Sequence, residues 1–109
     1  MMKAALIAVV LFSGVANAQT YHCDVVINKK DMYYVTAKVD DHENQFTAEL
    51  VNKRDKVSTV IKSPVLQRSD SGTLSIFKDK DFYMSKVENG TRGYVIVENG
   101  MEIYLVGCE

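Results

Sequence analysis

The sequence predicts a small all-β protein: an antiparallel barrel of about eight strands, closed by a disulfide between its N- and C-terminal strands. Three observations lead to this prediction. Hydrophobic and polar residues alternate along most of the chain after residue 18, as they do in strands with one buried face. Clusters of turn-forming residues interrupt the alternation at roughly the 8–12-residue spacing of all-β folds, and helical spacing is absent. The two cysteines stand near the two ends of this region.

Residues 1–18 have the composition of a secretory signal peptide. Lys3 precedes an apolar run from Ala4 to Phe12, and the segment ends in Ala16-Asn17-Ala18. A positive charge, a short apolar run and a small-x-small ending are the three parts of such a signal. The run is shorter than the ~20 apolar residues that a membrane-spanning helix needs. We therefore predict cleavage after Ala18, no membrane anchor, and a periplasmic or secreted protein.

Residues 19–109 are too few for two ordinary hydrophobic cores, so we predict one domain. The nine segments with strand character are 20–27, 32–39, 45–52, 56–62, 65–68, 73–77, 82–87, 93–98 and 101–107. The barrel has eight or nine strands, depending on whether 65–68 pairs. Alternation assigns the following large residues to the interior: Tyr33, Val35, Val39, Phe46 and Leu50.

The stretch YVIVENGMEIYLV is the clearest hairpin. Asn99-Gly100 suits a two-residue type I′ turn, because both central positions of that turn have positive φ. Such a turn pairs Ile96 with Ile103. It places these residues on the core face: Tyr94, Ile96, Met101, Ile103 and Leu105. The opposite face is also apolar and carries Val95, Val97, Tyr104 and Val106. This outer face is either a binding surface or, as we favour, covered by the N-terminal segment or a long loop.

Cys23 and Cys108 are the only two cysteines. In an oxidising compartment such a pair is normally a disulfide, and no other pairing exists. Closing a loop of this length stabilises a protein by about 4–5 kcal/mol in the chain-entropy model. Barrel closure brings the first and last strands together, so we expect the disulfide at the seam of the barrel.

No pattern in the sequence indicates catalysis, a cofactor or a metal site. The stretch DDHEN around His42 lacks the spacing and the glycine of a calcium loop, and we interpret it as a solvated turn. His22 adjoins a cysteine that we place in a disulfide. Without Lys3, twelve basic residues stand against fourteen acidic ones, which excludes the basic character of nucleic-acid-binding domains.

The polar stretch QRSDSGTLSIFKDKDFYMSK stands between apolar strands, and Ser69, Ser71 and Gly72 fall in a small loop that could protrude. An ordinary turn is the alternative, because these are turn residues. Together with Tyr21-His22-Cys23, Tyr83-Met84-Ser85-Lys86 and Cys108, the stretch resembles the c-type lysozyme inhibitors of Gram-negative bacteria. Members of that family are exported β-barrels with a Tyr-x-Cys, a C-terminal cysteine and a Ser-Gly loop that enters the lysozyme cleft. Here Ser75 stands at the position of the family's loop tyrosine, and tryptophan is absent.

The resemblance implies a protein that blocks a cell-wall hydrolase by inserting the Ser-Gly loop into its cleft. Ser71 or Ser69 would offer a hydroxyl to the catalytic carboxylates of the target, and Lys86 would add a charge-assisted contact. Tyr83 and Arg92 would be anchors at the rim, since Tyr and Arg are enriched at interface hot spots.

Three other functions remain open. The protein could be a periplasmic immunity protein against a toxin, or a structural envelope protein that assembles through the apolar outer face. It could also carry a small apolar ligand, although the large side chains predicted to point inward indicate a filled interior. The sequence allows either a monomer or a homodimer.

Overall fold

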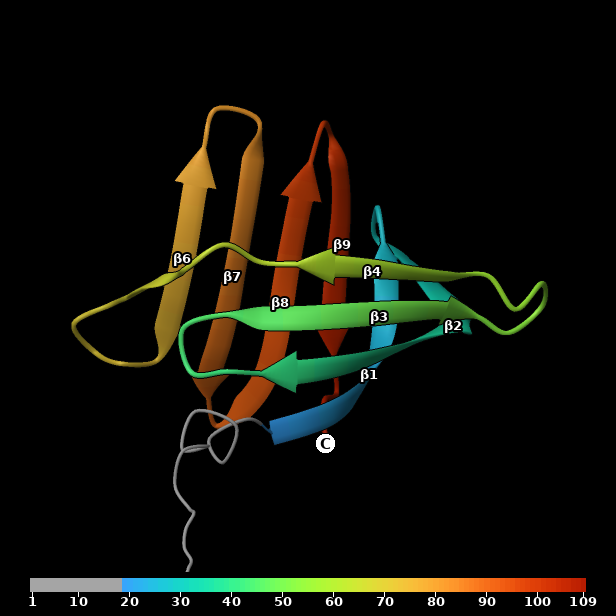
Figure 1. Cartoon of the computed structure of the whole chain (residues 1–109), viewed down its shortest axis with the longest axis horizontal. Coiled ribbons are helices and arrows are strands. Elements are labelled where there is room, and N and C mark those ends of the chain that lie inside the picture. The colour runs from blue at the N-terminus through green and yellow to red at the C-terminus, as the bar shows by residue number, and fades with distance from the viewer. Residues whose placement is uncertain (1–18) are drawn as a thin grey trace, which may run out of the picture.

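The computed structural model describes residues 19–109, which form one curled antiparallel sheet of nine strands (Figure 1). The strands are β1 (Gln19–Ile27), β2 (Lys30–Asp41), β3 (Phe46–Asn52), β4 (Ser58–Lys62), β5 (Gln67–Arg68), β6 (Leu74–Asp79), β7 (Phe82–Asn89), β8 (Thr91–Glu98) and β9 (Met101–Val106). Their order across the sheet is β4-β3-β2-β1-β9-β8-β7-β6-β5. Strands β3 and β4 cross in front of β8 and β9 in Figure 1, so that the two halves of the sheet face each other across the core. The all-β prediction is therefore confirmed.

The first and last strands are neighbours, as predicted. Asp24 of β1 lies opposite Val106 of β9, and Val26 lies opposite Tyr104. Beside this pairing, Cys23 and Cys108 form the predicted disulfide. A disulfide is compatible with an oxidising, exported compartment. The predicted signal peptide lies outside the described residues. Within them, no helix could cross a membrane.

The predicted closure of the barrel is wrong, because the sheet stays open between β4 and β5. The segment 63–66 crosses from one edge to the other, and its polar groups bind the start of β3 and the turn before it. Ser63 N donates to Phe46 O at 2.8 Å, and Leu66 N donates to Asn44 O at 2.7 Å. Pro64 has no N–H for a ladder. The result is a half-barrel of nine strands, and the disulfide lies in the middle of the sheet instead of at a seam.

The core lies between the two halves of the sheet. Its buried hydrophobic residues are Cys23, Val25, Ala37, Val39, Phe46, Ala48, Leu50, Leu66, Met84, Tyr94, Ile96, Ile103 and Leu105. Tyr33 was predicted to be interior, and this is wrong: it is 76% exposed. The pairing of β1 with β2 shifts register after Asp24, and both Met32 and Val35 pack against the core. Such an irregularity reverses the alternation, which turns Tyr33 outward.

The C-terminal hairpin has the predicted register. Ile96 pairs with Ile103 and Tyr94 with Leu105, and both Asn99 and Gly100 have positive φ. The outer face of this hairpin remains partly exposed, and Val106 is 41% exposed. All nine described strands belong to one sheet whose halves meet on the inner side. The cover that we expected over the outer face is therefore not supplied by a strand within residues 19–109.

Candidate functional site

The candidate site lies at one end of the sheet, where three connections meet. These are the β2–β3 turn (42–45), the β5–β6 loop (69–73) and the β7–β8 turn around Gly90. Glu88 N donates to Thr73 O at 2.8 Å, and Lys86 Nζ donates to Glu43 O. We call this region the loop end. It holds a shallow cavity of about 310 Å³ whose lining includes Gln19, Arg68, Glu88 and Arg92.

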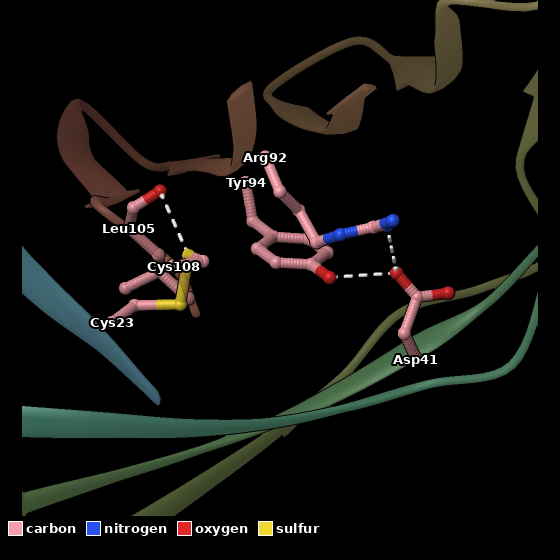
Figure 2. The surroundings of a disulfide bond; sticks show 6 residues. All are labelled: Cys23, Asp41, Arg92, Tyr94, Leu105 and Cys108. Carbon is pink, nitrogen blue, oxygen red and sulfur yellow. Dashed lines mark hydrogen bonds and ion pairs between the residues drawn. A yellow bond between two sulfur atoms is a disulfide. The ribbon is translucent and has the colours of Figure 1, made fainter. Parts of the chain in front are cut away.

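Asp41 is the centre of the charged groups at the loop end. It follows Ala37 and Val39 on the inner face of β2 and is only 5% exposed. Its carboxylate accepts hydrogen bonds from Lys86 Nζ at 2.9 Å and from Tyr94 Oη at 2.6 Å. A third donor, Arg92, lies 3.2 Å from Oδ2. Figure 2 shows Tyr94 and Arg92 converging on this carboxylate. Asp41 thereby joins β2 to β7 and β8 across the interior.

Lys86 is 1% exposed, which is rare for a lysine unless its charge is paired. Besides Asp41 and the Glu43 carbonyl, its ammonium has Glu88 Oε2 at 3.8 Å. The amine therefore binds groups of its own chain and offers no donor to the solvent. It fixes the β2–β3 turn against β7.

Arg92 extends from the buried pair to the surface. Its guanidinium contacts Glu88 Oε1 at 3.0 Å, and it lies 4.3 Å from the centre of the Tyr21 ring, a cation–π geometry. Tyr21 and Cys23 share the inner face of β1, so the Tyr-x-Cys motif places its aromatic ring under this arginine. The cluster thus contains two acidic residues, Asp41 and Glu88, and two basic residues, Lys86 and Arg92, so its net charge is zero.

The β5–β6 loop is exposed and internally hydrogen-bonded. Ser69 Oγ lies 3.1 Å from Ser71 Oγ, which in turn lies 2.8 Å from Thr73 Oγ1. Ser69 N donates to Leu74 O and Gly72 N to Ser69 O. Gly72 has φ +79, and a Cβ there would meet nothing within 4 Å. The loop is therefore a defined turn with its hydroxyls at the surface.

Most of the predicted partner-binding residues lie at the loop end. Ser69, Ser71 and Gly72 form the loop, and Lys86 and Arg92 belong to the charged cluster behind it. Tyr83 does not join them, because it lies near the opposite end of β7, on the outer face beside Val97.

Sequence reasoning missed Asp41, Tyr94 and Glu88 as members of this cluster. Alternation through Ala37 and Val39 could have placed Asp41 on the buried face, but DDHEN also matched an exposed turn. Tyr94 was assigned to the core without a polar partner.

Burial raises the pKa of Tyr94 above its ordinary value of 10, and the hydrogen bond to Asp41 raises it further. Below pH 10 the folded and unfolded states both keep the phenolic proton. Above pH 10 the unfolded state loses it first, so stability falls as pH rises, by about 1.4 kcal/mol per pH unit from this group. We expect Tyr94→Phe to lack this component of alkaline destabilisation in urea titrations between pH 9 and 12.

Tyr33→Phe is the control for that measurement, because the Tyr33 ring is at the surface. It should keep the alkaline slope of the unsubstituted protein. Identical slopes for Tyr94→Phe and the unsubstituted protein would contradict the assignment.

In Figure 2 the disulfide lies on the other side of Tyr94 from Asp41. Cys108 Sγ is 3.7 Å from Leu105 O; because the sulfur is oxidised, it carries no proton to donate. Among residues 19–109 there is no free thiol, and no three metal-binding side chains come together in this part of the chain. The described groups at the loop end are therefore hydroxyls, guanidinium groups, paired charges and the exposed carboxylate of Asp70, which suit recognition by hydrogen bonding.

Comparison of the chain with protein-family models, with curated proteins and with solved structures found no match.

Proposed function

We propose that this protein works by binding another protein at the loop end, and that the partner is a cell-wall hydrolase of the c-type lysozyme class. The β5–β6 loop would enter the cleft of the hydrolase and block access of its substrate. The observation that carries this proposal is the loop itself, which is exposed, internally hydrogen-bonded and tied at both ends to the sheet.

A loop already held in one conformation loses little entropy when it binds, which favours affinity. Ser71 is the exposed member of the hydroxyl series. A serine hydroxyl can donate to a carboxylate, and hydrogen bonds to charged acceptors are stronger than those between neutral groups. Catalytic carboxylates in a hydrolase cleft would be such acceptors.

The positive charge beside the loop comes from Arg68 in this proposal. The Lys86 ammonium is already bound to the Asp41 carboxylate and the Glu43 carbonyl. Its role is therefore to hold the loop end together. Arg68 is exposed, and the side chain of Arg92 is 24% exposed. Both line the shallow cavity next to the loop. Because Arg92 is already paired with Asp41 and Glu88, Arg68 would be the group that attracts the acidic groups of a hydrolase cleft.

The proposal assigns no catalytic activity to this chain. A buried acid and a buried base lie together at Asp41 and Lys86, but each neutralises the other at 2.9 Å. The remaining polar groups of the loop are the hydroxyls of Ser69, Ser71 and Thr73, which are hydrogen-bonded to one another, and the exposed carboxylate of Asp70.

We expect the exported protein to inhibit lysis of cell walls by a c-type lysozyme at near-stoichiometric ratios. Ser71→Ala should weaken inhibition about 10- to 100-fold, because a hydrogen bond to a charged group contributes about 1.5–3 kcal/mol. Gly72→Ala should also weaken inhibition, since alanine at positive φ strains the loop by about 1 kcal/mol or more. Lysis rates at rising inhibitor concentration measure both effects.

Gly100→Ala is the matched control for Gly72→Ala. Gly100 has φ +84 and equally open space around a Cβ, but it lies in the β8–β9 turn at the opposite end of the sheet. It should lower stability to a similar degree and leave inhibition intact. A folded protein that fails to inhibit at large molar excess would reject this target and direct attention to toxins, as for an immunity protein.

A further inference from the structure

The outer face of β6–β9 carries a continuous apolar surface that the proposed function does not use. We call it the outer patch and define it by these residues: Leu74, Ile76, Tyr83, Val87, Val95, Val97, Tyr104 and Val106. The register of the strands arranges most of it in three rows. The rows are Lys78–Tyr83–Val97–Glu102, Ile76–Ser85–Val95–Tyr104 and Leu74–Val87–Gly93.

The outer patch lacks a partner within the described residues, and its size is that of the apolar patches on monomers that are often functional. Four strands spaced about 4.8 Å apart, over three rows about 7 Å apart, cover roughly 300–400 Å². Contiguous apolar areas of several hundred Å² on a monomer are often functional. The two charges on the first row, Lys78 and Glu102, stand at opposite ends of that row. Neither takes part in an ion pair within residues 19–109, where all such pairs involve Lys86 or Arg92.

We propose that the outer patch binds a second copy of this chain in a symmetric, face-to-face dimer. The two-fold axis runs along the strands, between β7 and β8. This operation places β6 of one copy over β9 of the other and β7 over β8, while each row stays level with itself. Two-fold interfaces of this kind require a surface that is complementary to itself.

The first row meets this requirement in charge. The rotation brings Lys78 of each copy over Glu102 of the other, so that two opposite-charge pairs flank the interface. Between them, Tyr83 of one copy lies over Val97 of the other. Charges of opposite sign at the rim favour this register and disfavour a shifted one.

The central residues of the other two rows are complementary to themselves in size. The small Ser85 lies opposite Val95 of the second copy, and Val87 lies opposite Gly93. Gly93 has no side chain, and even a Cβ there would approach Leu105 O to 3.2 Å, so the position is a depression in the face. At the centre of these two rows, a larger side chain is thus matched with a smaller one, as in the packing of two β-sheets.

The area of this interface is small. A face of this size is about half of the ~800 Å² per partner that a stable interface buries. We infer a dissociation constant on the order of 10–100 μM, in the range of weak complexes. Because the axis runs along the strands, both loop ends point in the same direction. The dimer would present two β5–β6 loops side by side.

Sedimentation velocity of the exported protein, at concentrations from about 5 μM to 1 mM, tests the proposal against the inferred dissociation constant. The sedimentation coefficient should rise from that of a monomer to that of a dimer. Val95→Lys places a charge at the centre of the outer patch and should leave a monomer throughout. Val60→Lys is its matched control, because Val60 is 63% exposed on β4, outside the patch. It should dimerise like the unsubstituted protein.

Charge reversal tests the register separately, with positions that tolerate polar substitutions. Lys78→Glu and Glu102→Lys should each raise the dissociation constant about tenfold, because each places like charges together twice. Combining both should restore it to within about threefold, as expected for directly coupled sites. Near-UV circular dichroism checks the fold of each variant.

A monomer at all concentrations would overturn the proposal and leave the outer patch to a different partner. A dimer that is equally sensitive at Val60 would place the interface elsewhere. Unchanged dissociation constants in both single reversals would overturn the two-fold arrangement along the strands.

Discussion

Removing the Cys23–Cys108 disulfide is expected to lower the free energy of unfolding by about 2–5 kcal/mol. The two cysteines are 85 residues apart in sequence, so the bridge closes a loop of nearly the whole described chain. In the folded state β1 and β9 are already held together by their backbone pairing. The bridge therefore acts mainly on the unfolded state, whose conformations it restricts. Urea unfolding of the Cys23→Ala/Cys108→Ala double variant measures the loss.

The same loss should follow when the unsubstituted protein is reduced with a thiol, and the double variant should be insensitive to the reductant. The m-value should increase on removal of the bridge, because a chain without the crosslink exposes more surface when it unfolds. A decrease in the free energy of unfolding below about 1 kcal/mol would contradict the view that the bridge stabilises the protein by restricting the unfolded chain.

Replacing Asp41 by alanine is expected to cost about 3–5 kcal/mol. The substitution leaves the Lys86 ammonium buried with only a backbone carbonyl and a distant carboxylate. It also removes the acceptor of the buried Tyr94 hydroxyl. A buried charge without its partner is among the largest single destabilising changes known in proteins. The midpoint of urea or thermal unfolding measures the effect.

Asp40→Ala is the matched control for Asp41→Ala. Asp40 is the adjacent residue, on the opposite face of β2, and accepts an exposed hydrogen bond from Thr20 at 2.9 Å. Its replacement should cost less than about 1 kcal/mol, as for surface polar contacts.

The pairing itself is tested by adding Lys86→Met to Asp41→Ala. The double variant should be more stable than Asp41→Ala alone, because it no longer buries an unpaired ammonium. Strictly additive losses would contradict the view that Asp41 and Lys86 act as a pair.

Much of the fold could be predicted from local patterns. Asn99-Gly100 dictates a tight turn by its backbone preference alone, and the turn fixes the pairing of every residue in the last hairpin. Tyr33 was assigned to the wrong face because the irregular pairing of β1 with β2 cannot be recognised in the sequence pattern of hydrophobic and polar residues. The prediction of a closed barrel was wrong for a similar reason. β4 and β5 do not pair with each other, and between them Ser63 and Leu66 instead donate hydrogen bonds to residues distant in sequence.

The candidate site could be predicted only in part. The loop residues Ser69, Ser71 and Gly72 lie where turn composition placed them, because turn preference is local. The role of Lys86 depends on Asp41, which is 45 residues away, and no local pattern connects the two.

The sequence by itself determined the β-strands, the last hairpin, the single possible disulfide and the adjacency of the first and last strands. The strands and the hairpin depend on interactions between residues close in sequence. The disulfide has only one possible pairing, because the chain has two cysteines, and it brings the first and last strands together. Only the tertiary structure decided that the sheet stays open, that Lys86 is buried against Asp41, and that no described strand covers the outer patch. Those features depend on how the two halves of the sheet meet across the core, and alternation along one strand shows that a face is apolar but not what covers it.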